Sequence, residues 1–427
     1  MATASIRSDG SSRYSKGNKW GYFPSFALAW RISDEPFMKQ FTFLDDLKLR
    51  LSYGSTGSTA INAYATLNML SIGKTAIGDS GVRTYYAAST TLPSDLKWET
   101  TDQFNIGLDW ALFNSHLRFT IDWYHKMTRD LLNSVALASS TGYSSMLRNI
   151  GKMQNNGLEI SSSGDIFNTS DVKWTASGNI SINKNEVKKL YGGQDIFSGD
   201  PGLPYMSGNI CLVREGEPVG TFYTLKEDGY DEKGRIKYVD KNNDGIINDD
   251  DKFITGDANP DFTYGFTTNL NYKGMEFGIM LQGSQGNDIY NVGETANLDL
   301  GYGMNVRKEV WQSHWDASQT PEQNARAKYP IISRSVNNRH SDRYIEDGSY
   351  LRLKDISLGY NLPLAKWKVN WMRVLKVYVS GQNLLTFTHY SGIDPEVNSY
   401  GNDVNAGIDD LSYPNTKSIT FGLRAEF

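Results

Sequence analysis

The last eleven residues, Lys417-Ser-Ile-Thr-Phe-Gly-Leu-Arg-Ala-Glu-Phe427, decide the fold class. Because successive side chains of a β-strand point to opposite faces, this segment has one wholly apolar face and one wholly polar face. The apolar face carries Ile419, Phe421, Leu423, Ala425 and Phe427. Such a strand fits either the core of a β-sandwich or the wall of a membrane barrel, with lipid on one side and water on the other. The chain stops on an aromatic residue, and we expect this of a barrel whose last strand closes against the first.

Length and composition narrow the choice. At 427 residues the chain is long enough for two domains or for one large barrel. No run approaches the ~18 consecutive apolar residues that a membrane helix needs, which excludes a helical membrane protein but not a barrel. The net charge is −5 with both signs interspersed, so no basic surface indicates a nucleic-acid partner. The single cysteine, Cys211, cannot form an internal disulfide.

The same alternation recurs along the chain. It is clearest in the segments 25–32, 47–53, 103–112, 117–124, 174–183, 262–272 and 375–385. Tight turns at 113–115 and 273–274 join some of them, whereas long polar stretches at 55–98, 189–260, 287–345 and 388–415 are expected to be loops. Short turns at one rim and long loops at the other are typical of outer-membrane barrels. We therefore predict an all-β fold, a transmembrane antiparallel β-barrel portion of roughly a dozen strands with long extracellular loops and short periplasmic turns.

Seven stretches resemble the SusC/RagA-like TonB-linked outer-membrane transporters of Bacteroidota. They are Gly21–Ser33 (GYFPSFALAWRIS), Leu96–Asp109 (LKWETTDQFNIGLD), Ser140–Leu147 (STGYSSML), Asn259–Phe266 (NPDFTYGF), Gly283–Asn291 (GSQGNDIYN), Asp347–Tyr360 (DGSYLRLKDISLGY) and Ser380–Phe387 (SGQNLLTF). Together they span nearly the whole chain in the family's order. They cover only the C-terminal half of the family's pattern.

This resemblance implies that residues 1–427 are the C-terminal part of a 22-stranded TonB-dependent transporter barrel. The sequence does not start with a signal peptide. It also lacks the family's small N-terminal domain, TonB box, plug and first barrel half, which in family members come before the part that this chain matches. An open sheet edge cannot face hydrocarbon, because each unpaired backbone group there costs several kcal/mol. On this expectation the fragment alone would not transport.

The resemblance also implies a location and partners. The chain is expected in the outer membrane of a Gram-negative cell, surrounded by outer-membrane lipid. The substrates would be oligosaccharides or peptides too large for porins. A SusD-like surface lipoprotein would cover the barrel, and the TonB–ExbB–ExbD complex would act through the N-terminal part that is absent from the sequence.

One loop carries a metal-binding pattern, from Asp240 to Asp251. It follows the calcium-loop grammar D-x-[DN]-x-[DN]-G-x-I-x-x-x-[DE]. The predicted oxygen ligands, in loop order, are Asp240, Asn242, Asp244, the Ile246 carbonyl, Asn248 and Asp251. A polar turn that needs no metal has the same composition. We predict a structural Ca²⁺ that rigidifies a long extracellular loop. The Asp at position 12 is shorter than the usual Glu, which works against bidentate closure.

No catalytic site is expected, and the protein is predicted not to be an enzyme. The histidines do not have metal-ligand spacing, and we expect surface or wall positions for all five: His116, His125, His314, His340 and His389. Neighbouring carboxylates such as Asp409 and Asp410 point apart on a strand and are poor candidates for a hydrolase. The alternative function is a soluble or surface-exposed, calcium-stabilised β-sandwich module that binds glycans.

Overall fold

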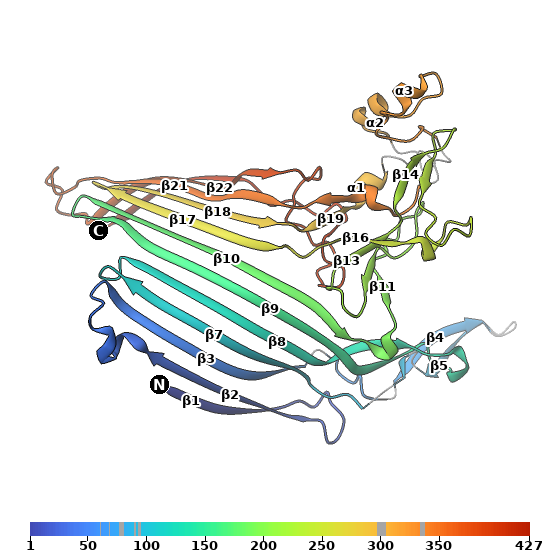
Figure 1. The fold of residues 1–427 in the computed structure, drawn as a ribbon, viewed down its shortest axis with the longest axis horizontal. Coiled ribbons are helices and arrows are strands. Elements are labelled where there is room, and N and C mark those ends of the chain that lie inside the picture. Colours follow the sequence, from blue (N-terminus) through green and yellow to red (C-terminus); the bar gives the residue numbers. More distant parts are fainter. Residues whose placement is uncertain are drawn as a thin grey trace.

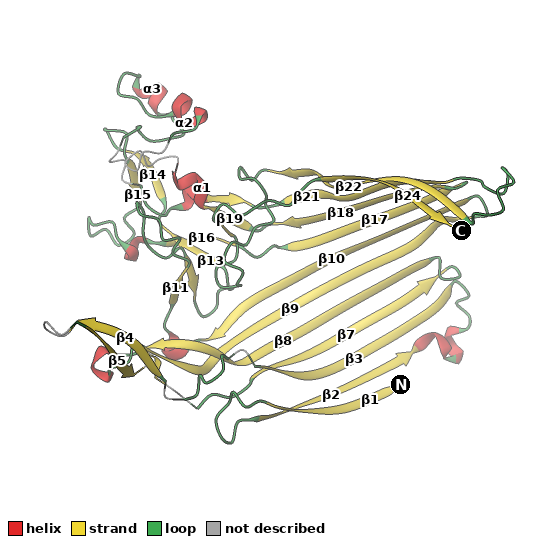
Figure 2. Ribbon diagram, turned by 180° about the vertical axis from the view of Figure 1, so that it is seen from behind, coloured by secondary structure: helices red, strands yellow, loops and turns green. Residues whose placement is uncertain are grey.

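The main element of the computed structural model is one curved sheet, which forms a trough (Figures 1 and 2). The structure describes residues 1–59, 61–67, 69–76, 81–88, 91–92, 95–296, 305–333 and 338–427. The neighbouring antiparallel strands are, in order, β1 (Ala2–Gly10), β2 (Trp20–Arg31), β3 (Leu44–Ser58), β7 (Glu99–Leu112), β8 (Leu117–Ala136), β9 (Ser145–Asn168), β10 (Val172–Lys189), β17 (Phe262–Tyr272), β18 (Met275–Gln285), β21 (Tyr350–Asn361), β22 (Val374–Thr388) and β24 (Ser418–Glu426). A short strand, β6 (Thr91–Leu92), pairs in parallel with β9. The predicted dozen antiparallel strands are confirmed.

The alternation of residues gives this sheet an apolar face and a polar face. On β24 the apolar side chains are open to the surroundings, with 63% of Ile419, 80% of Phe421 and 66% of Leu423 exposed. A β-sandwich would cover such a face with a second sheet, and among the described residues no second large sheet is present. The sandwich alternative was therefore wrong. A one-sided apolar sheet of this size fits a lipid-facing wall.

The connections between strands differ in length at the two ends of the sheet. At one end they are short and comprise residues 32–43, 113–116, 169–171, 273–274 and 362–373, and both chain termini lie toward this end (Figure 1). We call it the short-turn end. The opposite end carries the long connections, and we call it the long-loop end. Among the described strands, β1 and β24 have a neighbour on one side only, so the sheet is open along both.

The two tight turns are confirmed by the backbone. Phe113, Asn114 and Ser115 have φ angles of 57°, 58° and 61°, in the left-handed region. Lys273 and Gly274 also have positive φ, at 46° and 91°. Two central residues with positive φ give a turn whose twist matches that of the flanking strands, which joins β17 to β18 without an irregularity in their pairing.

The connections at the long-loop end are folded rather than plain loops. The stretch 55–98 was expected to be one loop, but β3 continues to Ser58 and a hairpin of β4 (Leu70–Ala76) and β5 (Val82–Ala88) projects from the end of the sheet (Figure 1). The stretches 189–260, 287–345 and 388–415 were also expected to be loops. They pack together instead, and we call this unit the loop domain. That part of the prediction was wrong, because residues far apart in the sequence supply a common core.

The loop domain is built from short elements. Its strands are β11 (Ile196–Ser198), β12 (Cys211–Val213), β13 (Thr221–Thr224), β14 (Glu227–Tyr230), β15 (Ile236–Tyr238), β16 (Phe253–Asp257), β19 (Asp288–Asn291), β20 (Ile345–Asp347) and β23 (Ile408–Asp409). Its helices are α1 (Val292–Thr295), α2 (Lys308–Ser313) and α3 (Pro321–Asn324). The core joins Phe222, Tyr290, Tyr344 and Ile408, each at most 1% exposed. All three long connections thus contribute to one buried cluster.

Single-turn 3-10 helices complete the secondary structure. They are η1 (Ile32–Asp34), η2 (Pro36–Met38), η4 (Ser139–Thr141), η5 (Tyr191–Gly193), η6 (Asp249–Asp251) and η9 (Asp342–Tyr344). Within the described ranges, every helix is too short or too polar to cross a membrane.

Candidate functional site

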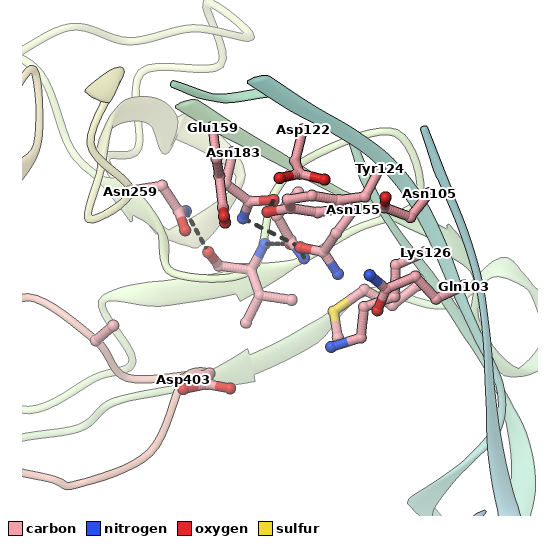
Figure 3. A pocket seen from close by; sticks show the side chains of 14 residues that line it. Gln103, Asn105, Asp122, Tyr124, Lys126, Asn155, Glu159, Asn183, Asn259 and Asp403 are labelled. Atoms are coloured by element: carbon pink, nitrogen blue, oxygen red, sulfur yellow. Dashed lines mark hydrogen bonds between the residues drawn. The ribbon is translucent and has the colours of Figure 1, made fainter. Parts of the chain in front are cut away.

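A polar cavity lies between the polar face of the sheet and the loop domain (Figure 3). Its volume is about 750 Å³. Strands β7 to β10 supply its wall with Gln103, Asn105, Asp122, Tyr124, Lys126, Met153, Asn155, Glu159, Asn183 and Asn185, and the loop domain and its flanking residues supply Val219, Asn259, Asp403 and Ala406. Amide side chains are the most frequent kind in this lining. Each amide offers both a donor and an acceptor, which suits an uncharged ligand rich in hydroxyl or peptide groups.

A chain of hydrogen bonds holds several of these amides in place. Asn155 on β9 accepts bonds from Asn183 (3.2 Å) and from Asn185 (3.0 Å), both on β10. The hydroxyl of Tyr124 donates to Asn183 across 3.1 Å. These bonds link three neighbouring strands on the polar face (Figure 3). The cavity wall is thus fixed before any ligand arrives, which lowers the entropic cost of binding.

The cavity is fastened to the loop domain by backbone contacts. The N–H of Val219 donates to the side-chain oxygen of Asn185 (2.9 Å). The side chain of Asn259 donates to the carbonyl of Val219 (2.7 Å). The segment that leads into β13 is therefore tied both to the sheet and to the residues that precede β17. A rearrangement of the loop domain would move this side of the cavity.

An ion-pair network lies beside the cavity on the same polar face. Arg50 on β3 donates to both carboxylate oxygens of Asp109 on β7, at 2.8 and 2.9 Å. It also donates to Asp122 on β8 at 2.9 Å. Lys48 adds a second cation 3.2 Å from Asp109. Charged side chains on this face, opposite the apolar one, are expected of a wall that faces water.

The predicted calcium loop forms a tight turn at the surface of the loop domain. Asp240 accepts bonds from the N–H groups of Asp244 (3.3 Å) and Gly245 (2.8 Å). Gly245 has φ of 82°, the left-handed conformation that the loop pattern assigns to glycine. Asp251 is buried and accepts from the backbone of Lys241 and Asn248, each at 2.8 Å. These bonds, the one from Asn248 foremost, hold the pKa of Asp251 below its usual value.

The other predicted ligands lie in the same turn. Asn242 donates to a carboxylate oxygen of Asp244, and the Asn248 side chain accepts from the backbone of Asp250. The Ile246 side chain points outward and is 65% exposed. The predicted ligand of this residue is its backbone carbonyl. Across the described residues, no three His, Cys, Asp or Glu side chains gather closely enough to hold a metal ion. The predicted carboxylate ligands lie in one loop, where they accept hydrogen bonds from backbone N–H groups. The calcium site therefore stays a prediction.

One histidine does not lie where it was expected. His340 is 4% exposed, inside the loop domain, and its Nδ1 is 2.7 Å from the hydroxyl of Tyr290. Its environment is neither surface nor sheet wall, so the expectation was wrong for this residue. Burial, with a smaller contribution from the nearby Lys252, lowers the pKa of His340 to about 4. His340 is therefore a neutral core residue at ordinary pH.

Part of the cavity was missed by sequence reasoning. The alternation around Asn105 and Asn183 predicted a polar face, but not which residues of it meet. Asn155 and Asn185 come together because they are direct partners across the β9–β10 pair. Segment 145–168 was not singled out as a strand, since its polar run lacks a clear apolar alternation. The fold and this polar cavity are those of a membrane β-barrel protein.

Comparisons with known proteins extend that conclusion. Residues 1–384 match the family described as TonB dependent receptor-like, beta-barrel. The match covers most of the chain, and the chain belongs to this family. The predicted location in the outer membrane is thereby confirmed, as is the resemblance to SusC/RagA-like proteins.

Individual relatives agree with this assignment. TonB-dependent receptor P3 of Formosa agariphila is 37% identical over 448 residues, covering 100% of this chain and 44% of the relative. TonB-dependent receptor SusC of Bacteroides thetaiotaomicron is 34% identical over 445 residues, covering 100% of this chain and 42% of the relative. A solved structure described as the RagAB peptide transporter superposes with a TM-score of 0.83 at 25% identity, covering 100% of this chain and 46% of that one. The chain spans less than half the length of these relatives.

Proposed function

We propose that the protein takes part in the TonB-dependent import of large nutrients, oligosaccharides or peptides, across the outer membrane. The observation that carries this proposal is the polar cavity between the sheet and the loop domain. Its position at the long-loop end places it where a ligand from outside the cell would first meet the wall. Its volume of about 750 Å³ is within the usual range for small-ligand sites, and it holds one segment of a longer substrate.

The lining offers a ligand many hydrogen bonds from its amides, next to the charged side chains of Lys126, Glu159 and Asp403. The amides of Asn105, Asn155 and Asn183 present donors and acceptors side by side. Sugar hydroxyls and peptide groups both match this pattern. One similar structure supports the peptide class, because it is described as the RagAB peptide transporter. The substrate is proposed to be one of these classes.

The partners follow from the same family. A SusD-like surface lipoprotein is proposed to cover the long-loop end, and the TonB–ExbB–ExbD complex to supply energy from the periplasm. The loop domain offers a folded surface for such a cover, since its core joins all three long connections. The proposed Ca²⁺ at 240–251 would stiffen that surface through oxygen ligands of Asp240, Asn242 and Asp244. No role in catalysis is proposed for it.

The import proposal is tested by removing the amides at the centre of the cavity. Asn155→Ala with Asn185→Ala should reduce uptake of labelled oligosaccharides or of labelled peptides at least tenfold, in cells that express the gene. The matched control is Asn271→Ala, an exposed amide toward the short-turn end of the sheet and outside the cavity. The control should retain uptake.

Two results would count against import. One is full uptake of both substrate classes by the double variant at equal abundance in the outer membrane. The other is equal uptake in cells with and without a functional TonB. Either would leave the fold assignment intact, because that assignment rests on the sheet and on the family match.

A further inference from the structure

The connection between β21 and β22 differs from the other short connections in its charge. Residues 362–373 (LPLAKWKVNWMR) contain Lys366, Lys368 and Arg373 and no acidic residue. The connections 32–43, 113–116, 169–171 and 273–274 each contain no more than one Lys or Arg. The positive charge of the short connections is therefore concentrated in this one.

These three cations are free to bind a ligand. Nearby cations are paired: Lys376 with Glu276, and Arg424 with Glu426. Lys366, Lys368 and Arg373, by contrast, form no ion pair with any described residue, and all three are exposed. Unpaired cations in one short connection repel one another, so an anion bound by this connection would relieve that repulsion.

The same connection contains two exposed tryptophans. Trp367 is 56% exposed and Trp371 is 67% exposed. The ring of Trp371 stacks on Phe427, with centroids 5.8 Å apart and an interplanar angle of 20°. Phe427 continues the row of Ile419, Phe421 and Leu423, which is the apolar face of β24. The aromatic pair therefore extends the lipid-facing surface to the level of the basic turn.

The turn is held in a defined shape. Leu364 is 7% exposed, and its carbonyl accepts from the N–H groups of Trp367 and Val369, each at 3.0 Å. The N–H of Arg373 donates to the carbonyl of Glu426 at 2.6 Å, which ties the turn to the last strand. The cations and the tryptophans are thus presented by an ordered segment.

We propose that residues 362–373 together with Phe427 form a binding site for an anionic phospholipid of the periplasmic leaflet. The phosphate would lie among Lys366, Lys368 and Arg373, and the acyl chains would run along the apolar face of β24. Tryptophan is favoured at this depth because its ring is apolar and its N–H reaches the wet headgroup layer. This site goes beyond nutrient import and would act whatever the substrate.

Lipid binding can be measured on the protein purified in a mild non-ionic detergent. Native mass spectrometry would follow titrations with phosphatidylglycerol and with phosphatidylcholine of the same acyl chains. The protein should bind phosphatidylglycerol roughly tenfold more tightly, because each cation near an anionic headgroup strengthens binding. The variant K366Q/K368Q/R373Q should lose this preference. The control K16Q/K19Q/K74Q, which removes three exposed cations at the long-loop end, should keep it.

A second measurement needs no variant. Added salt screens exposed charges, so it should erase the preference of the unaltered protein for phosphatidylglycerol. Equal binding of both lipids by the unaltered protein would overturn the proposal, as would a preference that survives in the triple variant. A triple variant with normal lipid preference but low abundance in the outer membrane would show that a protein recognises the turn during assembly, which also overturns the lipid site.

Discussion

The guanidinium of Arg50 on β3 reaches Asp122 on β8, two strands away, at an Nη2–Oδ2 distance of 2.9 Å. The strand between them, β7, has Gly107 at the crossing point. A Cβ atom there would lie 2.4 Å from Asp122 Oδ1 and 2.6 Å from Arg50 Cζ. Because Gly107 has no side chain, the guanidinium of Arg50 can pass over β7 and bind carboxylates on both β7 and β8.

Gly107→Ala is expected to break the contact between Arg50 and Asp122. Both side-chain ends can move aside without moving the backbone, so the loss is that of one partly exposed ion pair, about 1 kcal/mol. Thermal unfolding in detergent would measure it. Gly54→Ala on β3 is the control, because its nearest neighbour would be Ser25 Cβ at 3.7 Å. Equal destabilisation by both changes would contradict this role for Gly107.

Arg352 is the most buried cation in the ion pairs of the described residues, at 2% exposure. It donates to Asp394, which is 5% exposed, and to Glu396 at 2.7 Å. Burial alone would raise the pKa of Asp394, but the backbone of Glu396 and Asn415, with Arg352, holds it below its usual value. The pairing anchors the last long connection to β21.

Arg352→Met should destabilise the protein by roughly 3 kcal/mol, because it leaves Asp394 buried without its cation. Lys237→Met removes an exposed pair with Asp228 and should cost less than ~1 kcal/mol. Chemical denaturation of both variants provides the comparison. A cost for Arg352→Met no larger than that of Lys237→Met would rule out an anchoring role.

His340 predicts a pH dependence of the loop domain. Its pKa is lowered to about 4 by burial, so the unfolded chain binds a proton more readily than the folded one. Stability is therefore lost as pH falls from about 6.5 toward 4, by up to roughly 3 kcal/mol from this residue. Lys252, Asp200 and Asp249 also face this ring electrostatically, and Tyr290 is its hydrogen-bond partner.

His340→Gln should flatten this pH dependence, since glutamine stays neutral and still offers an acceptor to Tyr290. Thermal unfolding of both proteins between pH 4 and pH 7 would be followed by intrinsic fluorescence. Carboxylates such as Asp394 contribute equally to the two curves, so the difference between the curves isolates the histidine. Parallel curves would show that His340 is not a buried neutral group.

The calcium loop predicts binding that depends on its first and fifth residues. Titration calorimetry should detect Ca²⁺ binding by the protein and none after Asp240→Ala or Asp244→Ala, because each removes a carboxylate ligand. Asp250→Ala is the matched control, an exposed carboxylate in the same loop at a non-ligand position. Unchanged binding in the Asp240 and Asp244 variants would refute the site.

The sheet could be predicted from the sequence because each strand shows its alternation of apolar and polar residues within a single short segment. In 417–427 every second residue is apolar, and this alone sets the strand and its two faces. The turn at 113–115 was equally readable between two alternating segments. β9 was missed because residues such as Ser161 to Ser163 place small polar groups on both faces.

The loop domain and the cavity could not be predicted in the same way. Tyr290 and Ile408 meet in one core although more than a hundred residues separate them, and neither sits in a periodic segment. The pairing of Asn155 with Asn185 depends on strand register, which polar residues specify weakly. Nothing in the sequence next to Arg352 predicts that it pairs with Asp394.

The central claim, that one face of the sheet meets lipid and the other meets water, can be measured on β24. Spin labels would be attached to single cysteines at Ile419, Phe421 and Leu423, and at Thr420 and Arg424, in lipid bilayers; the natural Cys211 is buried. The account predicts that labels at the first three positions collide with dissolved oxygen, and those at the other two with a water-soluble nickel complex. Equal access of both reagents along the whole strand would contradict it.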